Sequence, residues 1–294
     1  MILDVPIINA FTDGHVGGNP AGVVLDADRF STADKQRIAA AVGLSETAFV
    51  SGSTEADVKL EFFTPIQQIA HCGHATIATF SYLQQTGQLD KAETSKETID
   101  GRREILMEGD SAYMQQMAPR YEPLTPELLE DTLQALNIKA SDLIFSADPY
   151  VVNTGNSFLI IGLKSAELVK TLQVDQASIE YISNELNLIG FYVFALGSKR
   201  AGRDAGARMF APRIGVEEES ATGMAAGPLA CYLHDKLSVD SEEFYIEQGH
   251  WMPTPSPSLI NVRLTFNENG SVNGLFAGGR ADIGEIRRIE VDSQ

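Results

Sequence analysis

The stretch that decides the fold reads GHATIATFSYL at residues 73–83, and it aligns without gaps on GMAAGPLACYL at residues 223–233. Four of the eleven positions are identical. Upstream of each stretch, a strand-like run ends in an aromatic residue followed two positions later by proline: Phe63 and Pro65, then Phe210 and Pro212. Chance similarity between two alanine-rich helices is the alternative. The repeat favours two similar halves, in each of which a glycine opens a helix of small residues.

Composition limits the class of protein. The chain has 294 residues, 44% of them hydrophobic, which is enough for one large domain or two medium ones. Acidic residues outnumber basic ones by 40 to 22, for a net charge of -18, and no basic stripe is present to bind nucleic acid. Two cysteines are too few for a disulfide framework. With no basic leader and no apolar run near the roughly 18 residues of a membrane span, we expect a cytoplasmic protein that binds no membrane.

Short apolar runs that alternate with polar residues recur along the chain and predict strands. Helical patterns are fewer: one follows Ser31 and stops at Gly43, one opens at Thr125 and runs to about Leu136, and one covers residues 178–186. The mixture predicts the α+β class, with curved sheets that each wrap a helix or two.

The boundary between the halves is expected where two prolines fall among polar residues at 118–123. We therefore predict an N-terminal half over residues 1–118 and a second half over residues 119–279. A C-terminal strand at about 280–294 is expected to pack back onto the first half.

The two repeated helix starts, at Cys72-Gly73 and at Thr222-Gly223, are candidate anion sites. The first amide groups of a helix have no partner within it, and they attract negative charge. Two such helices that face one cleft would hold a small anionic substrate, such as a carboxylate. The alternative is that the small residues only permit close helix packing.

Glu46 is the candidate proton shuttle. It directly precedes an apolar run that begins at Thr47, so burial is expected to raise its pKa toward the range of a general acid or base. A solvated side chain is the alternative. Cys72, just before a helix, is expected to have a lowered pKa, and His74 in the first turn is placed to hydrogen-bond a substrate. The glycine-rich loop around Asn19 is either a substrate loop or an ordinary turn.

A metal site at His71, Cys72 and His74 is disfavoured, because zinc sites use separated pairs of ligands and no second pair lies nearby. The loop at residues 17–22 matches neither a Walker A loop nor a dinucleotide fingerprint. We expect no intrinsic metal and no cofactor.

Several motifs in fixed order resemble the phenazine-biosynthesis isomerase family, the PhzF-like proteins with the diaminopimelate-epimerase fold. The motifs are FT (11–12), GNPAGV (18–23), LSETAF (44–49), FTP (63–65), CGHATIA (72–78), Arg208-x-Phe210-x-Pro212, the run from Glu218 to Gly223, and QG (248–249).

The resemblance implies two similar halves, each a curved, mostly antiparallel sheet wrapped around a central helix, with the active site between them. It also implies a homodimer and no cofactor. It implies that Glu46 takes a proton from one carbon and returns it to another, that His74 matches the family histidine, and that Glu219 stands where the family has aspartate. The substrate-binding residues expected with them are Asn19, Ser45, Cys72, Gly73, Thr222, Gly223 and Met224.

The sequence departs from the family pattern in the second half. Glu219, Ser220 and Met224 replace aspartate, proline and serine, while Gln68 and Thr254 replace an acid and an arginine. Changed polar partners alter specificity sharply. The proton chemistry of a cofactor-independent isomerase is therefore expected without the phenazine substrate.

Two other functions are weighed against this one. An amino-acid racemase or epimerase on the same fold needs an acid and a base on opposite faces of the substrate carbon. Cys72 could supply one of them, but its counterpart in the repeat is Thr222. A non-enzymatic binding protein that retains the fold is the other alternative.

Overall fold

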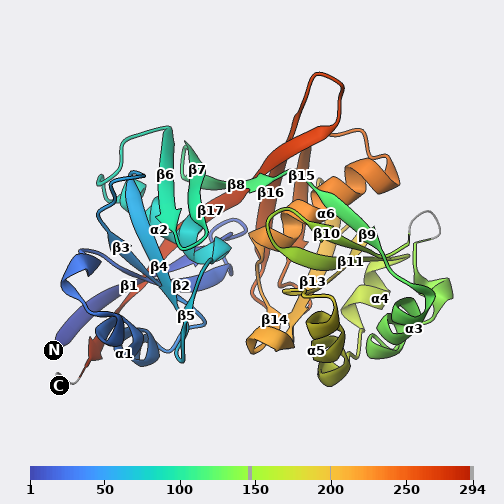
Figure 1. The fold of residues 1–294 in the computed structure, drawn as a ribbon, viewed down its shortest axis with the longest axis horizontal. Coiled ribbons are helices and arrows are strands. Elements are labelled where there is room, and N and C mark those ends of the chain that lie inside the picture. Colours follow the sequence, from blue (N-terminus) through green and yellow to red (C-terminus); the bar gives the residue numbers. More distant parts are fainter. Residues whose placement is uncertain (145–147, 199, 292–294) are drawn as a thin grey trace. The chain divides into compact units, whose positions relative to one another are not determined.

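The computed structural model describes residues 1–144, 148–198 and 200–291, and the chain divides into two compact units. Unit 1 holds residues 1–115 together with 278–294, and unit 2 holds residues 116–277. Figure 1 labels the helices and strands of both. The elements of unit 1 are β1 (Ile2–Ala10), β2 (Asn19–Val24), η1 (Ala27–Arg29), α1 (Thr32–Val42), β3 (Thr47–Ser51), β4 (Val58–Phe63), β5 (Gln68–Ile69), α2 (Gly73–Gln85), β6 (Glu93–Thr98), β7 (Gly101–Glu108), most of β8 (Ser111–Met117) and most of β17 (Val272–Glu290).

The strands of unit 1 form a mixed sheet in which most neighbouring pairs are antiparallel, as the sequence predicted. β1 pairs antiparallel with both β2 and β17, and β6 pairs antiparallel with β7. β2 pairs parallel with β3, and β4 with β6. Parallel neighbours need a long crossover connection, and here α1 and α2 supply it. The alternation of polar and apolar residues shows which face of a strand is buried, but it does not show the direction of the neighbouring strand.

The helix α2 begins at Gly73, as the repeat predicted, and Cys72 is its N-cap. It packs against β1, β2 and β3, and ten of its residues are buried (Figure 1). A helix that is small and apolar on most sides fits such a buried place. Because α2 is packed along most of its length, the position of its first turn is fixed.

The helix α1 is defined by its two ends. Ser31 and Asp34 form a capping box at its start, and Gly43 ends it in the left-handed conformation with φ of 69°. Such caps satisfy backbone groups that have no partner within the helix. The helix buries Ile38, Ala39 and Val42 in the hydrophobic core of unit 1. Residues 44–46 then connect the end of α1 to the start of β3.

Unit 2 has the same kinds of element in a longer series. They are β9 (Arg120–Pro123), α3 (Pro126–Ala135), η2 (Ala140–Asp142), β10 (Tyr150–Asn153), β11 (Ser157–Leu163), α4 (Ala166–Lys170), α5 (Gln176–Glu185), β12 (Gly190–Leu196), β13 (Ala205–Ala211), η3 (Pro212–Ile214), β14 (Val216–Glu219), α6 (Gly223–Leu237), β15 (Glu243–Gln248) and β16 (Ser258–Phe266).

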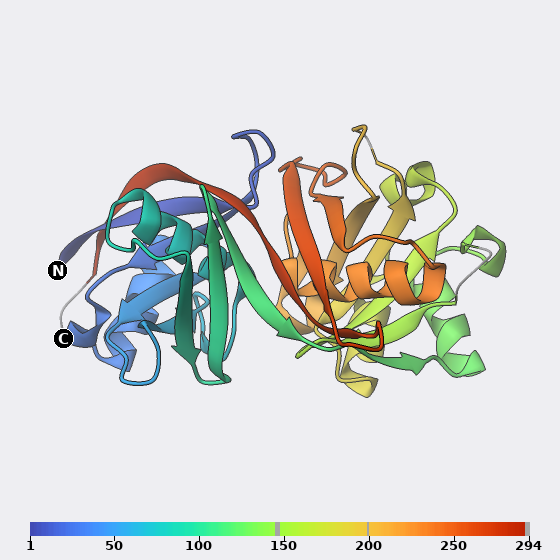
Figure 2. The same cartoon turned by 90° about the horizontal axis from the view of Figure 1, so that it is seen from above.

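The sheet of unit 2 is mixed as well. β12 pairs parallel with β11 and antiparallel with β13, and β13 pairs parallel with β15. The helix α6 begins at Gly223 and packs against β10, β11 and β16, where Figure 2 shows it in orange. Residues of α3, α5 and β12 share a second core cluster, which includes Ala135, Ile179 and Phe191. That each sheet wraps around a central helix stays a prediction.

Within the described residues, no helix has the length and apolar character needed to cross a membrane.

Candidate functional site

Glu46 lies directly before β3, in a place where two strands approach closely. Its backbone carbonyl accepts a hydrogen bond of 3.2 Å from the amide of Gly22 in β2. A side chain at Gly22 would place its Cβ 3.1 Å from Val42 and from Thr47, so glycine permits this approach. The Glu46 side chain is buried, with 7% of the residue exposed. The packing of β2 and β3 therefore holds a carboxylate away from bulk water.

Glu46, His74 and Cys72 form one cluster in unit 1. The Glu46 Oε2 atom lies 3.4 Å from His74 Nε2, and the Cys72 Sγ atom lies 3.6 Å from His74 Nδ1. All three residues are buried. The imidazole therefore stands between the carboxylate and the thiol, with one ring nitrogen toward each of them.

The expected lowered pKa of Cys72 is wrong. Burial raises the pKa of this thiol above its ordinary value, and this outweighs the opposite effect of neighbouring His74. The helix start was expected to stabilise a thiolate, but desolvation of a fully buried sulfur disfavours the charged form more strongly. Cys72 is therefore a neutral thiol near pH 7, suited to hydrogen bonding with His74.

Within the described part of unit 1, the same three residues form a group that could be considered for a metal. One atom from each lies within 4.8 Å of the others. In a tetrahedral zinc site, however, all ligand atoms point at a common centre. Here the two nitrogens of His74 face different partners. This arrangement suits a chain of proton donors and acceptors better than a chelate.

The first turn of α2 completes the group. Gly73, His74 and Ala75 are buried and follow Cys72 directly. The Thr76 hydroxyl donates a hydrogen bond of 2.6 Å to the carbonyl of Cys72, which fixes the conformation of the turn. Amide groups at such a helix start are donors for an anion. A carboxylate bound there would lie beside the Glu46–His74 pair.

Two predicted substrate residues of unit 1 have different surroundings. Asn19 is buried at the start of β2, where it pairs with Ala10 of β1. Ser45 is exposed in the short segment between α1 and β3. Asn19 is thus held by the sheet, whereas Ser45 adjoins Glu46 in the chain and is exposed to solvent.

The second cluster lies in unit 2, at the start of α6. The Thr222 hydroxyl donates a hydrogen bond of 2.6 Å to the carboxylate of Glu219, the last residue of β14. Gln248 accepts hydrogen bonds from the Thr222 amide (3.1 Å) and the Tyr192 hydroxyl (2.9 Å), and it donates one to the Glu219 carbonyl (2.7 Å). Burial and the Glu219 carboxylate raise the pKa of Tyr192. Side chains of the protein thus already engage this helix start.

Gly223 and Met224 are bound within unit 2 by neighbouring amides. The Gly223 carbonyl accepts a hydrogen bond of 2.9 Å from Gln116, and the Met224 sulfur accepts one of 3.5 Å from Asn156. The predicted site residues therefore fall into two groups, one in each unit. That these groups face one cleft stays a prediction.

Three residues in or beside these clusters received no role from the sequence. They are Tyr192 and Gln248 in unit 2 and, in unit 1, Lys96, whose Nζ atom lies 2.7 Å from the Thr76 hydroxyl. Gln248 belongs to a quoted motif, which was a signal that could have been used. Tyr192 lies in an apolar strand and Lys96 in a polar one. Neither pattern distinguishes a residue near a site from an ordinary strand residue.

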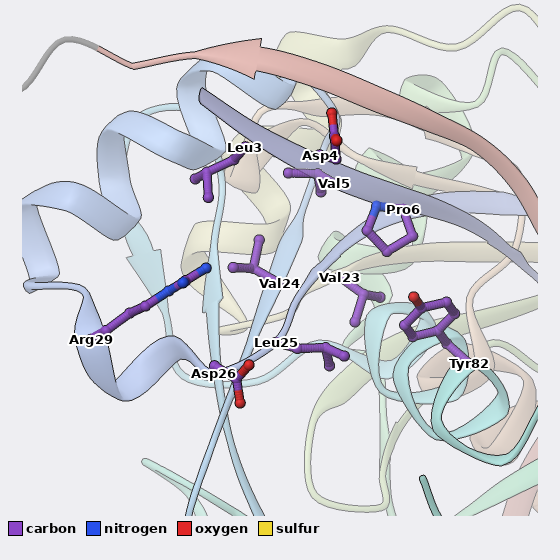
Figure 3. A pocket seen from close by; sticks show the side chains of 10 residues that line it. All are labelled: Leu3, Asp4, Val5, Pro6, Val23, Val24, Leu25, Asp26, Arg29 and Tyr82. Carbon is purple, nitrogen blue, oxygen red and sulfur yellow. The ribbon is translucent and has the colours of Figure 1, made fainter. Parts of the chain in front are cut away.

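A separate pocket of about 170 Å³ lies elsewhere in unit 1. Figure 3 shows it between β1, β2 and the end of α2, with Arg29 and Tyr82 on opposite sides. None of the ten residues that line it belongs to the predicted site. The chemistry discussed above therefore has no part in this pocket.

Known proteins resemble this chain over most of its length. The family model of phenazine biosynthesis-like proteins, PhzC-PhzF, matches residues 8–278. An uncharacterized isomerase of Clostridium acetobutylicum is 35% identical, over 92% of this chain and 93% of its own. The trans-2,3-dihydro-3-hydroxyanthranilate isomerase of Pseudomonas chlororaphis is 32% identical, over 97% of this chain and 93% of its own. The crystal structure of a PhzF-family phenazine biosynthesis protein from Bacillus anthracis superposes with a TM-score of 0.90 at 25% identity, over 99% of this chain and 100% of that one.

Proposed function

Because the chain belongs to the PhzC-PhzF family of phenazine biosynthesis-like proteins and is an isomerase, we propose that it moves a proton between two carbons of a small carboxylate substrate without a cofactor. The observation that carries the proposal is the buried Glu46 carboxylate, which faces His74 at the start of α2. A carboxylate in such a place can both take and give a proton.

In the proposed reaction, Glu46 removes a proton from one carbon of the substrate. The electron pair of the broken C–H bond moves into the unsaturated system of the substrate. The protonated Glu46 then delivers the proton to a second carbon, where a new C–H bond forms and the carboxylate is restored. The reaction involves no net oxidation or reduction, so these groups need no redox partner.

The neighbouring groups have positioning roles. His74 Nε2, at 3.4 Å, is placed to orient the Glu46 carboxylate, and the neutral Cys72 thiol beside Nδ1 holds the ring. The amide groups in the first turn of α2 point in the direction that favours an anion and are suited to bind the substrate carboxylate, so that the reacting carbon is presented to Glu46.

The proposed substrate class rests on a named relative and on the polar groups of the second cluster. The Pseudomonas chlororaphis relative is named for trans-2,3-dihydro-3-hydroxyanthranilate, so an unsaturated ring carboxylate is the first class to test. The hydroxyl of Thr222 is bound to Glu219 and the sulfur of Met224 to Asn156. The second cluster therefore offers a substrate other polar groups than the family pattern does, because Glu219 and Met224 stand in place of aspartate and serine. This difference supports a substrate other than the relative's.

The test compares Glu46→Gln with Glu55→Gln, a control in which an exposed glutamate loses the same charge. Both are assayed on trans-2,3-dihydro-3-hydroxyanthranilate and related ring carboxylates, with deuterium entry from heavy water followed by NMR. Loss of the acid–base group should lower turnover by about 10²–10⁴-fold, while substrate binding persists. Turnover that survives in Glu46→Gln would show that another group moves the proton.

We also propose that the enzyme works as a homodimer in the cytoplasm. The family resemblance supports the dimer, and the two free, buried cysteines suit a reducing compartment. Sedimentation equilibrium would test the dimer; a monomer at micromolar concentration would contradict it.

A further inference from the structure

Lys96, in β6, is a buried lysine that the proposed reaction does not use. The residue is fully buried, with 0% of its surface exposed. Its Nζ atom lies 2.7 Å from the Thr76 hydroxyl and 5.2 Å from the centre of the Phe62 ring. Among the residues that the structure describes, no carboxylate lies within ion-pair distance of this nitrogen. A buried lysine without an acid beside it is uncommon, because burial penalises the ammonium ion strongly.

Two hydrogen bonds connect Lys96 to the first turn of α2. The Thr76 hydroxyl donates its proton to the Cys72 carbonyl at 2.6 Å. It must therefore accept at its oxygen the hydrogen bond that Lys96 donates. The path runs from the lysine through Thr76 to the backbone of Cys72, whose side chain faces His74.

The titratable groups around Lys96 act on its ammonium form in both directions. His71, in the segment before α2, has its Nδ1 atom 3.5 Å from Lys96 Nζ. Burial and the neighbouring cations Lys96 and Arg103 lower the pKa of His71 well below its ordinary value, so this imidazole is neutral and accepts a hydrogen bond. The pKa of Lys96 is lowered to about 7, chiefly by burial and in smaller part by Arg103, while Cys72 and Asp100 act in the opposite direction.

We propose that Lys96 is a positioning residue of the Glu46–His74 site, and that its ammonium form strengthens the hold of the first turn of α2 on a substrate carboxylate. The inference rests on the proposed function for the presence of that carboxylate. The ammonium adds one positive charge beneath a helix start that already favours anions. It can only donate, so it fixes the direction of the Thr76 hydroxyl. A neutral amine loses the charge and can also accept, which leaves the hydroxyl free to turn.

The effect is expected on binding more than on the proton transfer itself. A unit charge at about 10 Å from an anion, at an effective dielectric constant of about 20, changes affinity by on the order of tenfold. The affinity for a carboxylate should therefore fall by about tenfold between pH 6 and pH 8.5, with KM rising and kcat changing less.

The first test measures the binding of anthranilate, a fluorescent ring carboxylate, at pH 6 and pH 8.5. Wild type should lose about tenfold in affinity over this range. Lys96→Arg should bind well at both pH values, because arginine keeps its charge, and Lys96→Met should bind weakly at both. The control is Lys164→Met, which removes one exposed charge in unit 2. A Lys96→Met protein that keeps the pH dependence of wild type would overturn the proposal.

The second test needs neither a ligand nor a substitution by methionine. Protein labelled with ¹³C at the cysteine carbonyls gives two signals, because the chain has two cysteines. The Cys72 signal should shift with a midpoint near pH 7 through the bond from Thr76, while the Cys231 signal serves as internal control. The inflection should disappear in Lys96→Arg.

An inflection that persists in Lys96→Arg, or a Lys96 Cε signal that titrates above pH 9, would refute the inference even if no tested compound is turned over. Conversely, a dependence on Lys96 with no effect of Glu46→Gln would refute the proposed function alone.

Discussion

The burial of Lys96 makes a quantitative prediction about stability. In an unfolded chain the lysine has its ordinary pKa of 10.5, whereas in the folded protein the pKa is about 7. Folding below pH 7 therefore requires an ammonium ion to be buried, and the difference of 3.5 units corresponds to about 5 kcal/mol at 1.36 kcal/mol per unit. Since Lys96 is fully buried, solvent screening does not reduce this penalty in the way it does for surface charges.

The sign follows from proton binding. Between pH 7 and pH 10.5 the unfolded chain holds a proton on Lys96 that the folded protein has released, so raising the pH favours the folded state. From pH 6 to pH 9 this lysine should raise the free energy of unfolding of wild type by about 2.7 kcal/mol. Lys96→Met lacks the titrating group, so its free energy of unfolding should lack this rise.

The assay is urea unfolding of both proteins at pH 6 and pH 9, followed by far-ultraviolet circular dichroism. Other groups titrate in this range, and those remote from Lys96 are common to both proteins and cancel in the difference. His71 does not cancel, because Lys96 contributes to its lowered pKa. Trp251, the single tryptophan, lies in unit 2 and reports separately on that unit. If the difference between the two proteins is equal at both pH values within about 0.5 kcal/mol, the folded protein does not release a proton from Lys96 and the reasoning fails.

Three further predictions concern single positions. Ser31→Ala removes the N-cap of α1 and should lower the free energy of unfolding by about 1 kcal/mol in urea melts, with Ser31→Asn close to wild type. Gly190→Ala would place a Cβ 2.3 Å from the Phe210 carbonyl, so it should cost on the order of 1–3 kcal/mol; an unchanged melting temperature would contradict this contact. Cys72 and Cys231 are buried with raised pKa values, so Ellman's reagent at pH 8 should react slowly with the native protein and fully in urea, and a fast native reaction would disprove their burial.

Local signals in the sequence predicted the elements of the fold well. Glycine at 73 and at 223 opens a helix in each case, and Ser31 and Gly43 lie at the ends of α1. Such features depend on residues that are near each other in the chain. The parallel pairing of β2 with β3 depends on how α1 crosses between them, and alternation within a strand contains no information about that connection.

The candidate site shows the same limit at the level of chemistry. The sequence brought Glu46, Cys72 and His74 together through motifs, and the structure places them in contact. It gave the wrong direction for the pKa of Cys72, because the degree of burial depends on packing from several strands. Lys96 lies in the charged run of β6, where it is indistinguishable from a surface lysine until the strand is packed against α2 and β4.

The pairing of β1 with β17 has a consequence for the order of events during synthesis. Ile2 of β1 pairs with Glu290 of β17. The part of β17 that belongs to unit 1 is synthesised only after the whole of unit 2. At about 5–20 residues per second, a ribosome takes roughly ten to thirty seconds to pass from residue 115 to residue 278. During that interval β1 has one neighbour, β2, and an open edge of the kind that recruits other chains. Unit 2 is continuous in sequence and can fold first. Unit 1 can complete its sheet only when β17 has been synthesised, although Glu46 and His74 are synthesised much earlier.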